Sequence, residues 1–482
     1  MARLSEKIGY GFGDMASSMF WKVFSYYLPF FYSNVFGLSL TDAGILVLVT
    51  RIWDAVSDPM MGIVADRTNT RWGKYRPYLL WVAAPFSICG ILLFTTPDWA
   101  YAGKLLWAYV TYILMMTVYT GINVPYGAML GVMSDNSHEK TVFSSFRMFF
   151  AYGGSFIALA AWEPLCSLFE NRWGLSIQNS WQCAMIVIAA ACFILFLCCF
   201  KLTRERIRSV SKVSIGSDFR ALLSNRPWWL LIGAALCFNL FSTVRGATVA
   251  YFFADVIGFD AHIMLFSIAL LFYSGLFLSI GEVANMVGVA LTVPIAGRLG
   301  KKTTFIFVNF LLIVLSVAFF FVPVTPAGYW WMLLLQVFIS VLTGIMSPLI
   351  WSMYADVSDY SELRYNTAST GLIFSSSSMA QKFGGAFGGA AVLWLLDACG
   401  YLTRTADQAS TALTQTSEAI SCLWMLMTFI PAGVALLAII VVWFYPLTTK
   451  RVNSIVAELK TRRIAQTTPP EYYEMTDPAN NI

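Results

Sequence analysis

The sequence predicts an all-α polytopic membrane protein with twelve transmembrane helices arranged as two six-helix halves. Three observations predict it. Of the 482 residues, 58% are hydrophobic and 12% are charged, whereas soluble domains are about 25% charged. Apolar blocks of about 18 residues or more recur along the chain, and each is long enough to cross a ~30 Å hydrocarbon layer. Finally, two motifs of the first half return in the second.

The apolar blocks define the predicted helices in order. They lie at 8–36, 41–65, 77–96, 103–133, 141–165, 181–201, 227–257, 263–296, 303–323, 328–355, 367–397 and 420–446. The most charged internal segment follows the sixth block. We therefore expect a bundle at 1–201, a cytoplasmic linker at 202–226, a second bundle at 227–446 and a cytoplasmic tail at 447–482.

Lysine and arginine are distributed unevenly between the two sides of this bundle. One side holds the basic loops 67–76 and 298–302, the linker and the basic tail, whereas the other holds only Lys104, Arg172 and Arg404. Positive loops stay in the cytoplasm, so both termini are expected there. The N-terminus lacks the pattern of a cleavable signal peptide. These features predict an integral protein of a bacterial inner membrane, with no need for a nucleic-acid partner.

The internal repeat indicates a transporter. TGINVPYGAML, from Thr120, resembles TGIMSPLIWSM, from Thr343, and VADR at 64–67 is echoed by IAGR at 295–298. Two six-helix halves in parallel orientation, with a site at their interface, are typical of secondary transporters. A channel or a membrane enzyme does not require this duplication.

Motifs of other protein classes are missing from the sequence. We find no nucleophile–base constellation, no phosphate loop and no metal motif, so neither an enzyme nor an organic cofactor is expected. Most of the nine cysteines lie in apolar blocks and are interpreted as core residues. Cys166 and Cys399 fall near predicted outer loops, which leaves a disulfide between them open.

Two carboxylates in the second block are the strongest functional candidates. Asp54 and Asp58 are four residues apart, which places them on one face of a helix. Two close carboxylates in a low-dielectric site cannot both stay ionised alone. They need a proton, a metal cation or an arginine. Ser57 and Thr120 would add neutral oxygens to a site for H⁺ or Na⁺. The alternative is a structural salt bridge of either aspartate with Arg51.

Charged residues elsewhere inside predicted helices point to a polar cavity, because each is costly in a bilayer. Lys382 would reach across the interface to Asp54 or Asp58. Arg147 occupies a similar place in the first half, or snorkels to the headgroups. Glu282 is the expected partner of either Lys22 or Arg245. The aromatic residues expected near the cavity are Trp21, Tyr26, Tyr119 and Tyr126.

RIWDAVSDPMMG followed by DRTNTRWGKYRPYLL resembles the signature of the glycoside–pentoside–hexuronide:cation symporters, the melibiose-carrier family of the major facilitator superfamily. The resemblance covers nearly the whole chain and implies the major facilitator fold. By position, Asp54 and Asp58 correspond to the cation-coupling carboxylates of that family, and Thr120 to a further ligand in its Na⁺-using members. Ser57 stands where those members have asparagine, which makes H⁺ coupling the more plausible choice.

The same resemblance bears on the substrate. Arg147 and Lys382 correspond to charged residues of the sugar and coupling region. Ser18 and Asn123 stand where melibiose carriers use aspartates to hold the sugar, and Gly127 replaces a stacking tryptophan. The resemblance therefore implies an oligosaccharide, a pentoside or a hexuronide rather than melibiose. Buried positive charges lean toward an anionic sugar.

Together these features predict a cation-coupled sugar or glycoside symporter that imports its substrate by alternating access. Its partners would be a small-molecule sugar, the cation and the bilayer. The basic cytoplasmic loops 67–76 and 298–302 would clamp the outward-open state by pairing with acidic neighbours such as Asp356 or Asp359, and would release them in the inward-open state. The residues expected in gating or salt bridges are Asp14, Arg51, Glu282, Asp356 and Asp359. A lipid transporter of the lysolipid type, with the same fold, remains the alternative.

Overall fold

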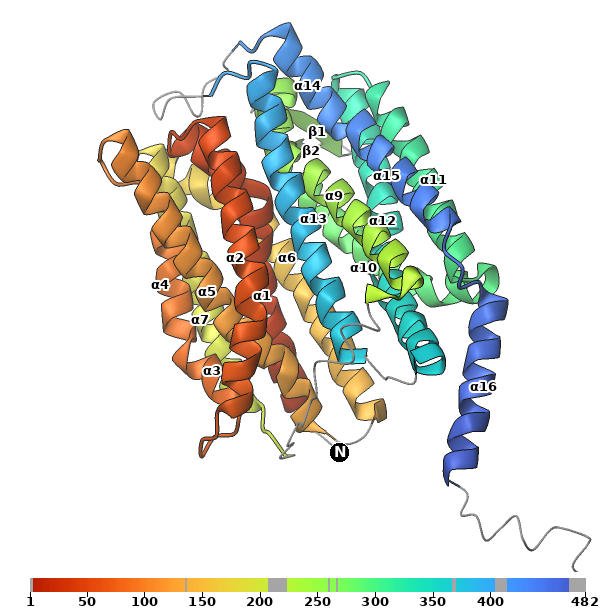
Figure 1. Ribbon diagram of the computed structural model, residues 1–482. Helices are drawn as coiled ribbons and strands as arrows, with labels where there is room; N and C mark the ends of the chain where they lie inside the picture. Colours follow the sequence, from red (N-terminus) through yellow and green to blue (C-terminus); the bar gives the residue numbers. More distant parts are fainter. Residues whose placement is uncertain are drawn as a thin grey trace, which may run out of the picture.

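The helices of the computed structural model stand side by side in one bundle (Figure 1). The structure describes residues 3–134, 137–206, 223–258, 261–265, 268–365, 370–403 and 414–467. Apart from one short hairpin, its regular elements are helices. The predicted all-α fold class is confirmed.

Each of the twelve predicted blocks overlaps one helical stretch. The first group is α1 (Leu4–Phe30), η1 (Phe31–Val35), α2 (Leu40–Arg67), α3 (Arg76–Trp81), α4 (Ala83–Leu93), α5 (Tyr101–Met133), α6 (Ser137–Trp173) and α7 (Ile177–Leu202). The second group is α9 (Arg226–Phe252), η2 (Phe253–Ile257), β1 (His262–Leu265), β2 (Ile268–Leu271), α10 (Ser274–Leu299), α11 (Lys301–Phe320), α12 (Pro326–Tyr365), α13 (Thr370–Ala398), α14 (Ser417–Met427), α15 (Phe429–Trp443) and α16 (Thr449–Thr467). α3 with α4, and α14 with α15, each correspond to one block.

Eight stretches in the described part of the chain are long and apolar enough to cross a membrane. Large apolar side chains also cover the outside of the bundle, for example Leu106 at 65% exposed, Ile194 at 59% and Phe310 at 55%. A soluble protein rarely exposes so much apolar surface, whereas lipid tails solvate it. The protein is therefore an integral membrane protein. α1, α2 and α13 are not among these eight stretches.

One predicted helix boundary was wrong. The block 263–296 does not begin as a helix, because β1 and β2 pair antiparallel, with His262 opposite Leu271, before α10 starts at Ser274. The two strands pair their backbone N–H and C=O groups with each other. A short apolar run fits a strand as well as a helix, so composition alone could not separate the two. The predicted tail forms the helix α16, whose Ile455 and Leu459 are buried. Most of the predicted linker, 207–222, lies outside the described residues, and the domain boundaries stay a prediction.

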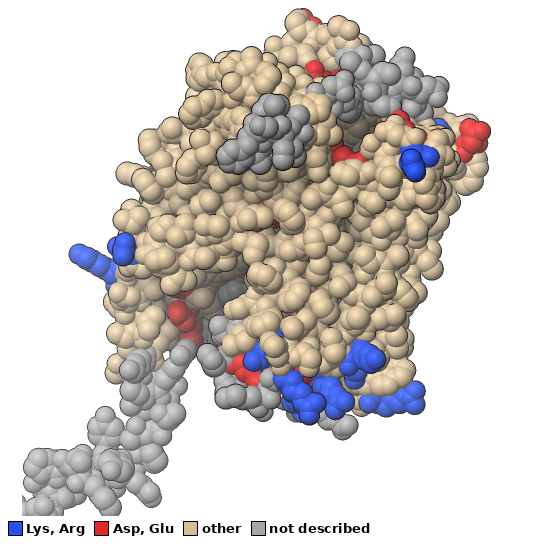
Figure 2. Space-filling view, turned by 180° about the vertical axis from the view of Figure 1, so that it is seen from behind, with Lys and Arg blue, Asp and Glu red and all other residues tan. Residues whose placement is uncertain are grey.

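The hydrophobic core joins the two helix groups at one end only. One cluster of buried residues contains the first group together with the parts of α9, α10, α12, α13 and α14 nearest the hairpin. A separate cluster fills the other end of the second group, between α9, α11, α12, α13, α15 and α16. The bundle is thus packed shut at the hairpin end. Toward the end where the N-terminus lies, the surface is hollowed, and Lys and Arg side chains gather along that edge (Figure 2).

A half-buried carboxylate strengthens the closed end. Glu163 on α6 accepts hydrogen bonds at Oε1 from the Tyr27 hydroxyl at 2.9 Å, from the Gly275 amide at 3.0 Å and from the Ser274 hydroxyl. It therefore links α1 and α6 to the start of α10. The Ser33 and Tyr251 hydroxyls make a second contact between the groups at 2.8 Å.

The cysteines do not form the disulfide that the sequence left open. All nine are free thiols, including Cys166 and Cys399.

We expect Glu163→Gln to loosen the closed end. Hydrogen bonds to a charged acceptor contribute about 1.5–3 kcal/mol each, and the amide replaces the carboxylate that three donors share. Hydrogen–deuterium exchange of residues 31–36 and 272–275 should increase. Glu418→Gln, an exposed position at the same end, serves as the control. Unchanged exchange in Glu163→Gln would show that the apolar core alone closes this end.

Candidate functional site

Five side chains from three helices meet at the centre of the bundle, and we call them the acidic cluster. α2 supplies Asp54, Ser57 and Asp58, α5 supplies Thr120, and α13 supplies Lys382. The spacing on α2 puts its three residues on one face. Asp54 is 0% exposed, while the side chain of Asp58 is 28% exposed. The cluster is therefore buried at Asp54 and open at Asp58.

Lys382 is the cation shared by the two carboxylates. Its Nζ lies 3.1 Å from Asp54 Oδ2 and also forms an ion pair with Asp58 Oδ2. Since α13 belongs to the second helix group, this interaction joins the two groups. One ammonium cannot neutralise two carboxylates, so the cluster keeps one negative charge in excess when both are ionised.

The hydroxyl groups leave this excess charge uncompensated. Thr120 Oγ1 is 3.1 Å from Asp54 Oδ1, 3.1 Å from Asp58 Oδ1 and 3.1 Å from Ser57 Oγ. Ser57 can donate to the Asp54 carbonyl oxygen at 3.0 Å, and a hydroxyl carries only one proton. Thr120 can therefore donate to only one of the two carboxylates. The Thr120 oxygen therefore faces the other carboxylate with no proton between them. A proton on that carboxyl, or a cation bound among these oxygens, would make this contact favourable.

Arg51 does not form the structural salt bridge with Asp54 or Asp58 that was the alternative to a cation site. It makes no ion pair within the described part of the chain, and its guanidinium lies 4.2 Å from the Trp21 ring centroid. Arg51 is 8% exposed, and its Nε has no hydrogen-bond partner among the described residues. Arg51 is thus a buried cation that stacks on an aromatic ring, an arrangement that stabilises arginine without a carboxylate.

Two adjoining cavities lie beside the cluster, between the helix groups. The first has a volume of about 280 Å³ and is lined by Lys22, Glu282 and Arg245 among others. The second has about 260 Å³ and is lined by Arg51 and Lys382 among others. Trp21, Ser25, Asn239 and Thr243 line both. The two cavities therefore form neighbouring parts of one central site.

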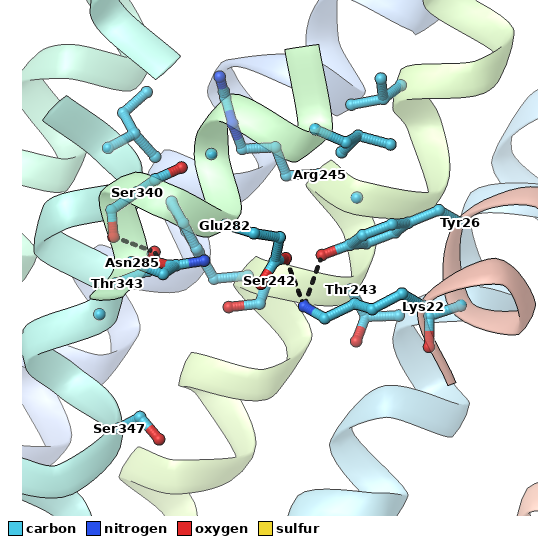
Figure 3. A pocket seen from close by; sticks show the side chains of 18 of the residues that line it. Lys22, Tyr26, Ser242, Thr243, Arg245, Glu282, Asn285, Ser340, Thr343 and Ser347 are labelled. Carbon is cyan, nitrogen blue, oxygen red and sulfur yellow. Dashed lines mark hydrogen bonds and ion pairs between the residues drawn. The ribbon is translucent and has the colours of Figure 1, made fainter. Parts of the chain in front are cut away.

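Lys22 and Glu282 form an ion pair in the wall of the first cavity (Figure 3). Lys22 Nζ is 2.5 Å from Glu282 Oε1 and 3.4 Å from the Tyr26 hydroxyl. Glu282 is 2% exposed, and its Oε2 has no hydrogen-bond partner among the described residues. This pair identifies Lys22 as the partner that the sequence could not choose.

Arg245 has no carboxylate partner within the described residues. Its Nη1 donates to the Met427 carbonyl at 2.7 Å and its Nη2 to the Gln336 side chain at 3.0 Å. The first cavity thus combines an ion pair, a further cation, neutral amides and hydroxyls, and the aromatic rings of Trp21, Tyr26 and Tyr152. Small-molecule sites have this mixture of ring surface and a few oriented polar groups.

Residues 9–449 match the family described as MFS/sugar transport protein. The chain belongs to this family. Among relatives, it is 34% identical to the Inner membrane symporter YicJ of Escherichia coli (strain K12), with 95% of each chain covered. It is 31% identical to the Glucuronide carrier protein homolog of the same organism (95% of this chain, 96% of the relative) and to the Isoprimeverose transporter of Lactiplantibacillus pentosus (92% and 89%).

Solved structures agree with the fold. The nucleoside transporter NupG superimposes with a TM-score of 0.64 at 15% identity, over 92% of this chain and all of that one. This likeness confirms the major facilitator fold that the sequence resemblance implied. The family model and the relatives confirm the family. The position of the acidic cluster between two helix groups agrees with the placement of sites in such transporters.

Four residues predicted for substrate binding are absent from the linings of both cavities: Ser18, Asn123, Tyr126 and Arg147. Arg147 Nε instead lies 2.9 Å from Asp14 Oδ2, and the Tyr126 hydroxyl donates to the Tyr10 carbonyl at 2.6 Å. Both contacts stay within the first helix group. These contacts place Arg147 and Tyr126 outside the two cavities described above, and their role in substrate binding stays a prediction.

One of the salt bridges predicted for the basic loops forms at Asp356. Lys301 Nζ lies 2.7 Å from both carboxylate oxygens of Asp356, and Asp359 follows half-buried on α12. The loop before α3 has a different anchor. Glu205 accepts the backbone amides of Lys74 and Tyr75 at 2.7 Å each and that of Arg76 at 2.6 Å.

Sequence reasoning missed three contributors to the site and its gates: Glu163, Glu205 and Asn285. Glu163 stands near the end of an apolar block in AAWEPLC, where its charge was the available signal. Glu205 belongs to a charged segment in which nothing distinguishes it. Asn285, in GEVANMVG, carried no charge to draw attention, and only the internal repeat could have revealed it.

We expect Lys382→Met to lower the unfolding temperature of the purified protein. Removing one partner from a buried ion pair costs about 3–5 kcal/mol, because a buried charge is left alone. Adding Asp54→Asn should recover part of the loss, since the remaining carboxylate, Asp58, is partly exposed. Lys104→Met, in the first turn of α5, is the control. Equal stability of Lys382→Met and the wild-type protein would contradict an ionised pair at this position.

Proposed function

We propose that this protein is a cation-coupled symporter that imports a sugar or glycoside by alternating access. The observation that carries the proposal is the acidic cluster. Two carboxylates share one lysine, which reaches them from the other helix group, directly beside a cavity suited to a polar small molecule. The family and the relatives, named as a symporter, a glucuronide carrier homologue and an isoprimeverose transporter, support the same function.

The coupling step follows from charge. A proton or Na⁺ that joins Asp54 and Asp58 removes the excess negative charge and weakens the hold of the two carboxylates on Lys382. Because Lys382 also lines the second cavity, its release changes the site offered to the sugar. By linkage, the sugar must then raise cation affinity by the same factor. Both H⁺ and Na⁺ remain candidates, and the serine at position 57 favours H⁺.

The orientation follows from the basic end of the bundle. Positive loops face the cytoplasm, so the hollowed end and both termini are placed inside the cell. On this proposal the closed end faces outward and the state is inward-facing. Lys301 and Asp356 are paired in it, so their ion pair is not a clamp that releases inward. Asp58, the more exposed carboxylate, is open on this side. The name of a relative supports a bacterial inner membrane as the location.

A sugar fits the cavities better than a lysolipid does. The first cavity is lined by amides, hydroxyls and ion-paired side chains. Sugar hydroxyls can pair with such groups, whereas an acyl chain would leave them without hydrogen bonds at a cost of about 1–3 kcal/mol each. An oligosaccharide, a pentoside or a hexuronide is therefore the proposed substrate.

We expect Asp54→Asn and Asp58→Asn each to abolish uphill accumulation in proteoliposomes. The probes are isoprimeverose, methyl β-D-xyloside and methyl β-D-glucuronide, tested under an inward H⁺ gradient or an inward Na⁺ gradient. Without an ionised pair, sugar movement loses its coupling to the cation, and accumulation should fall at least about tenfold to the equilibrium level.

Asp98→Asn, an exposed loop position, should accumulate sugar like the wild-type protein. Retained cation-driven accumulation in both aspartate variants would refute the role of the acidic cluster. Transport of a labelled lysolipid, with none of the sugars taken up, would favour the lipid transporter instead.

A further inference from the structure

The repeat of the sequence maps the acidic cluster onto a second place in the bundle. The TGI motifs align Thr120 with Thr343. The VADR and IAGR motifs, at 64–67 and 295–298, independently align α2 with α10. In this alignment Asp54 corresponds to Asn285. The structural counterparts of Asp54 and Thr120 are therefore Asn285 and Thr343.

The geometry of the cluster is repeated together with the sequence. Thr120 Oγ1 donates to Asp54 Oδ1 at 3.1 Å, between α5 and α2. Thr343 Oγ1 donates to Asn285 Oδ1 at 2.9 Å, between α12 and α10. Each half thus holds a threonine hydroxyl against the side-chain oxygen of an aspartate or asparagine on the neighbouring helix. The sequence alignment did not use this contact, so the two observations are independent.

The chemistry differs at one group. An amide is neutral, so Asn285 lacks the charge that would attract a proton or a metal cation. In exchange it gains two N–H donors. Its Nδ2 has no hydrogen-bond partner among the described residues, and both Asn285 and Thr343 line the first cavity. Figure 3 shows the Asn285 side chain directed toward the space beside Glu282.

The repeat also aligns a charged residue one turn before Asp54 with a charged residue one turn before Asn285. The offset that pairs Asp54 with Asn285 pairs Arg51 with Glu282. Both contact α1 at adjacent residues, because Arg51 stacks on Trp21 and Glu282 binds Lys22. The buried Oε2 of Glu282 is a further acceptor without a hydrogen-bond partner in the described part of the chain. The first cavity therefore offers an unused donor and an unused acceptor close together.

We propose that Asn285 and Thr343, beside the Lys22–Glu282 pair, form the subsite that binds adjacent hydroxyl groups of the sugar. This subsite is the second half's counterpart of the cation site, neutralised by the exchange of a carboxylate for an amide. A vicinal diol of a sugar ring matches it, since each hydroxyl both donates and accepts. The inference rests on the proposed function and adds to it the residues that select the substrate.

The test measures sugar binding to the full-length protein in nanodiscs. The probes are the three sugars named above, and the readout is sugar-dependent quenching of tryptophan fluorescence, because Trp21 lines the cavity. Asn285→Leu and Thr343→Val should each weaken sugar affinity about tenfold, the effect of one or two lost neutral hydrogen bonds. Thr343→Ser keeps the hydroxyl and should stay within about threefold of the wild-type affinity.

Matched variants separate this role from general packing. Thr292→Val alters a buried threonine on α10 whose hydroxyl donates, within the described part of the chain, to the Gly288 and Ile345 carbonyls. Thr292 does not line the cavity. The variant should leave sugar affinity unchanged. The dependence of the unfolding temperature on pH and Na⁺, measured without sugar, should match the wild-type protein in Asn285→Leu and Thr343→Val. That match also shows that both variants fold.

The outcomes distinguish the inference from the proposed function. Wild-type affinity for the sugar in both Asn285→Leu and Thr343→Val would overturn the inference alone. So would equal losses in Thr343→Ser and Thr343→Val. Absence of binding by the wild-type protein to all three sugars would refute the proposed function and the inference with it. Weaker sugar binding with an unchanged cation response is the result that supports the subsite.

Discussion

The sharing of one lysine by two carboxylates, one buried and one partly exposed, is the constraint on which the rest of this structure depends. Asp54 is fully buried, and a charge there is tolerated only with a partner. Lys382 is that partner, and it comes from the other helix group. The two groups are therefore held together at mid-depth by an interaction that is incomplete by one positive charge. Any cation that completes it also changes what holds the groups together.

The rest of the bundle makes this central interaction effective. At the hairpin end, the two groups share one apolar core, and the hydrogen bonds of Glu163 reinforce it. At the opposite end, the second group has its own core. A central site closed on one side and hollowed on the other is what alternating access requires. The same packing also explains why Asp58 is more exposed than Asp54, since Asp58 lies one helical turn nearer the hollowed end.

Much of this architecture could be predicted, because a bilayer imposes strong rules on sequence. The apolar blocks gave the helices, and the cost of buried charge singled out Asp54, Asp58 and Lys382. The limits of the prediction have physical causes. The hairpin before α10 is as apolar as a helix, so hydropathy could not separate them. The choice between Lys22 and Arg245 as the partner of Glu282 depended on helix rotation, which an apolar pattern leaves undetermined.

Other residues escaped prediction because their roles arise from contacts across the fold. Arg147 is a charged residue inside an apolar block, which suggested a place in the cavity. Its ion pair with Asp14 on α1 instead keeps it within the first group. Asn285 carried no charge, so nothing in its own block marked it. The correspondence of Asn285 with Asp54 follows from the repeat together with the hydrogen bond between Thr343 and Asn285. Internal duplication thus supplies information that a single block lacks, provided that the geometry of both copies is known.

The duplication also explains how two different chemistries can share one centre. In the first half, the aspartate of the repeat leaves a charge that needs a cation, and Arg51 beside it stacks on Trp21. In the second half, the corresponding positions hold an amide and a glutamate that binds Lys22. Trp21 and Lys22 are neighbours on α1, so a single turn of one helix contacts both places. A movement of α1 that alters one contact must alter the other, because a helix is stiff over one turn. This turn of α1 is therefore a direct structural connection between the two halves of the site.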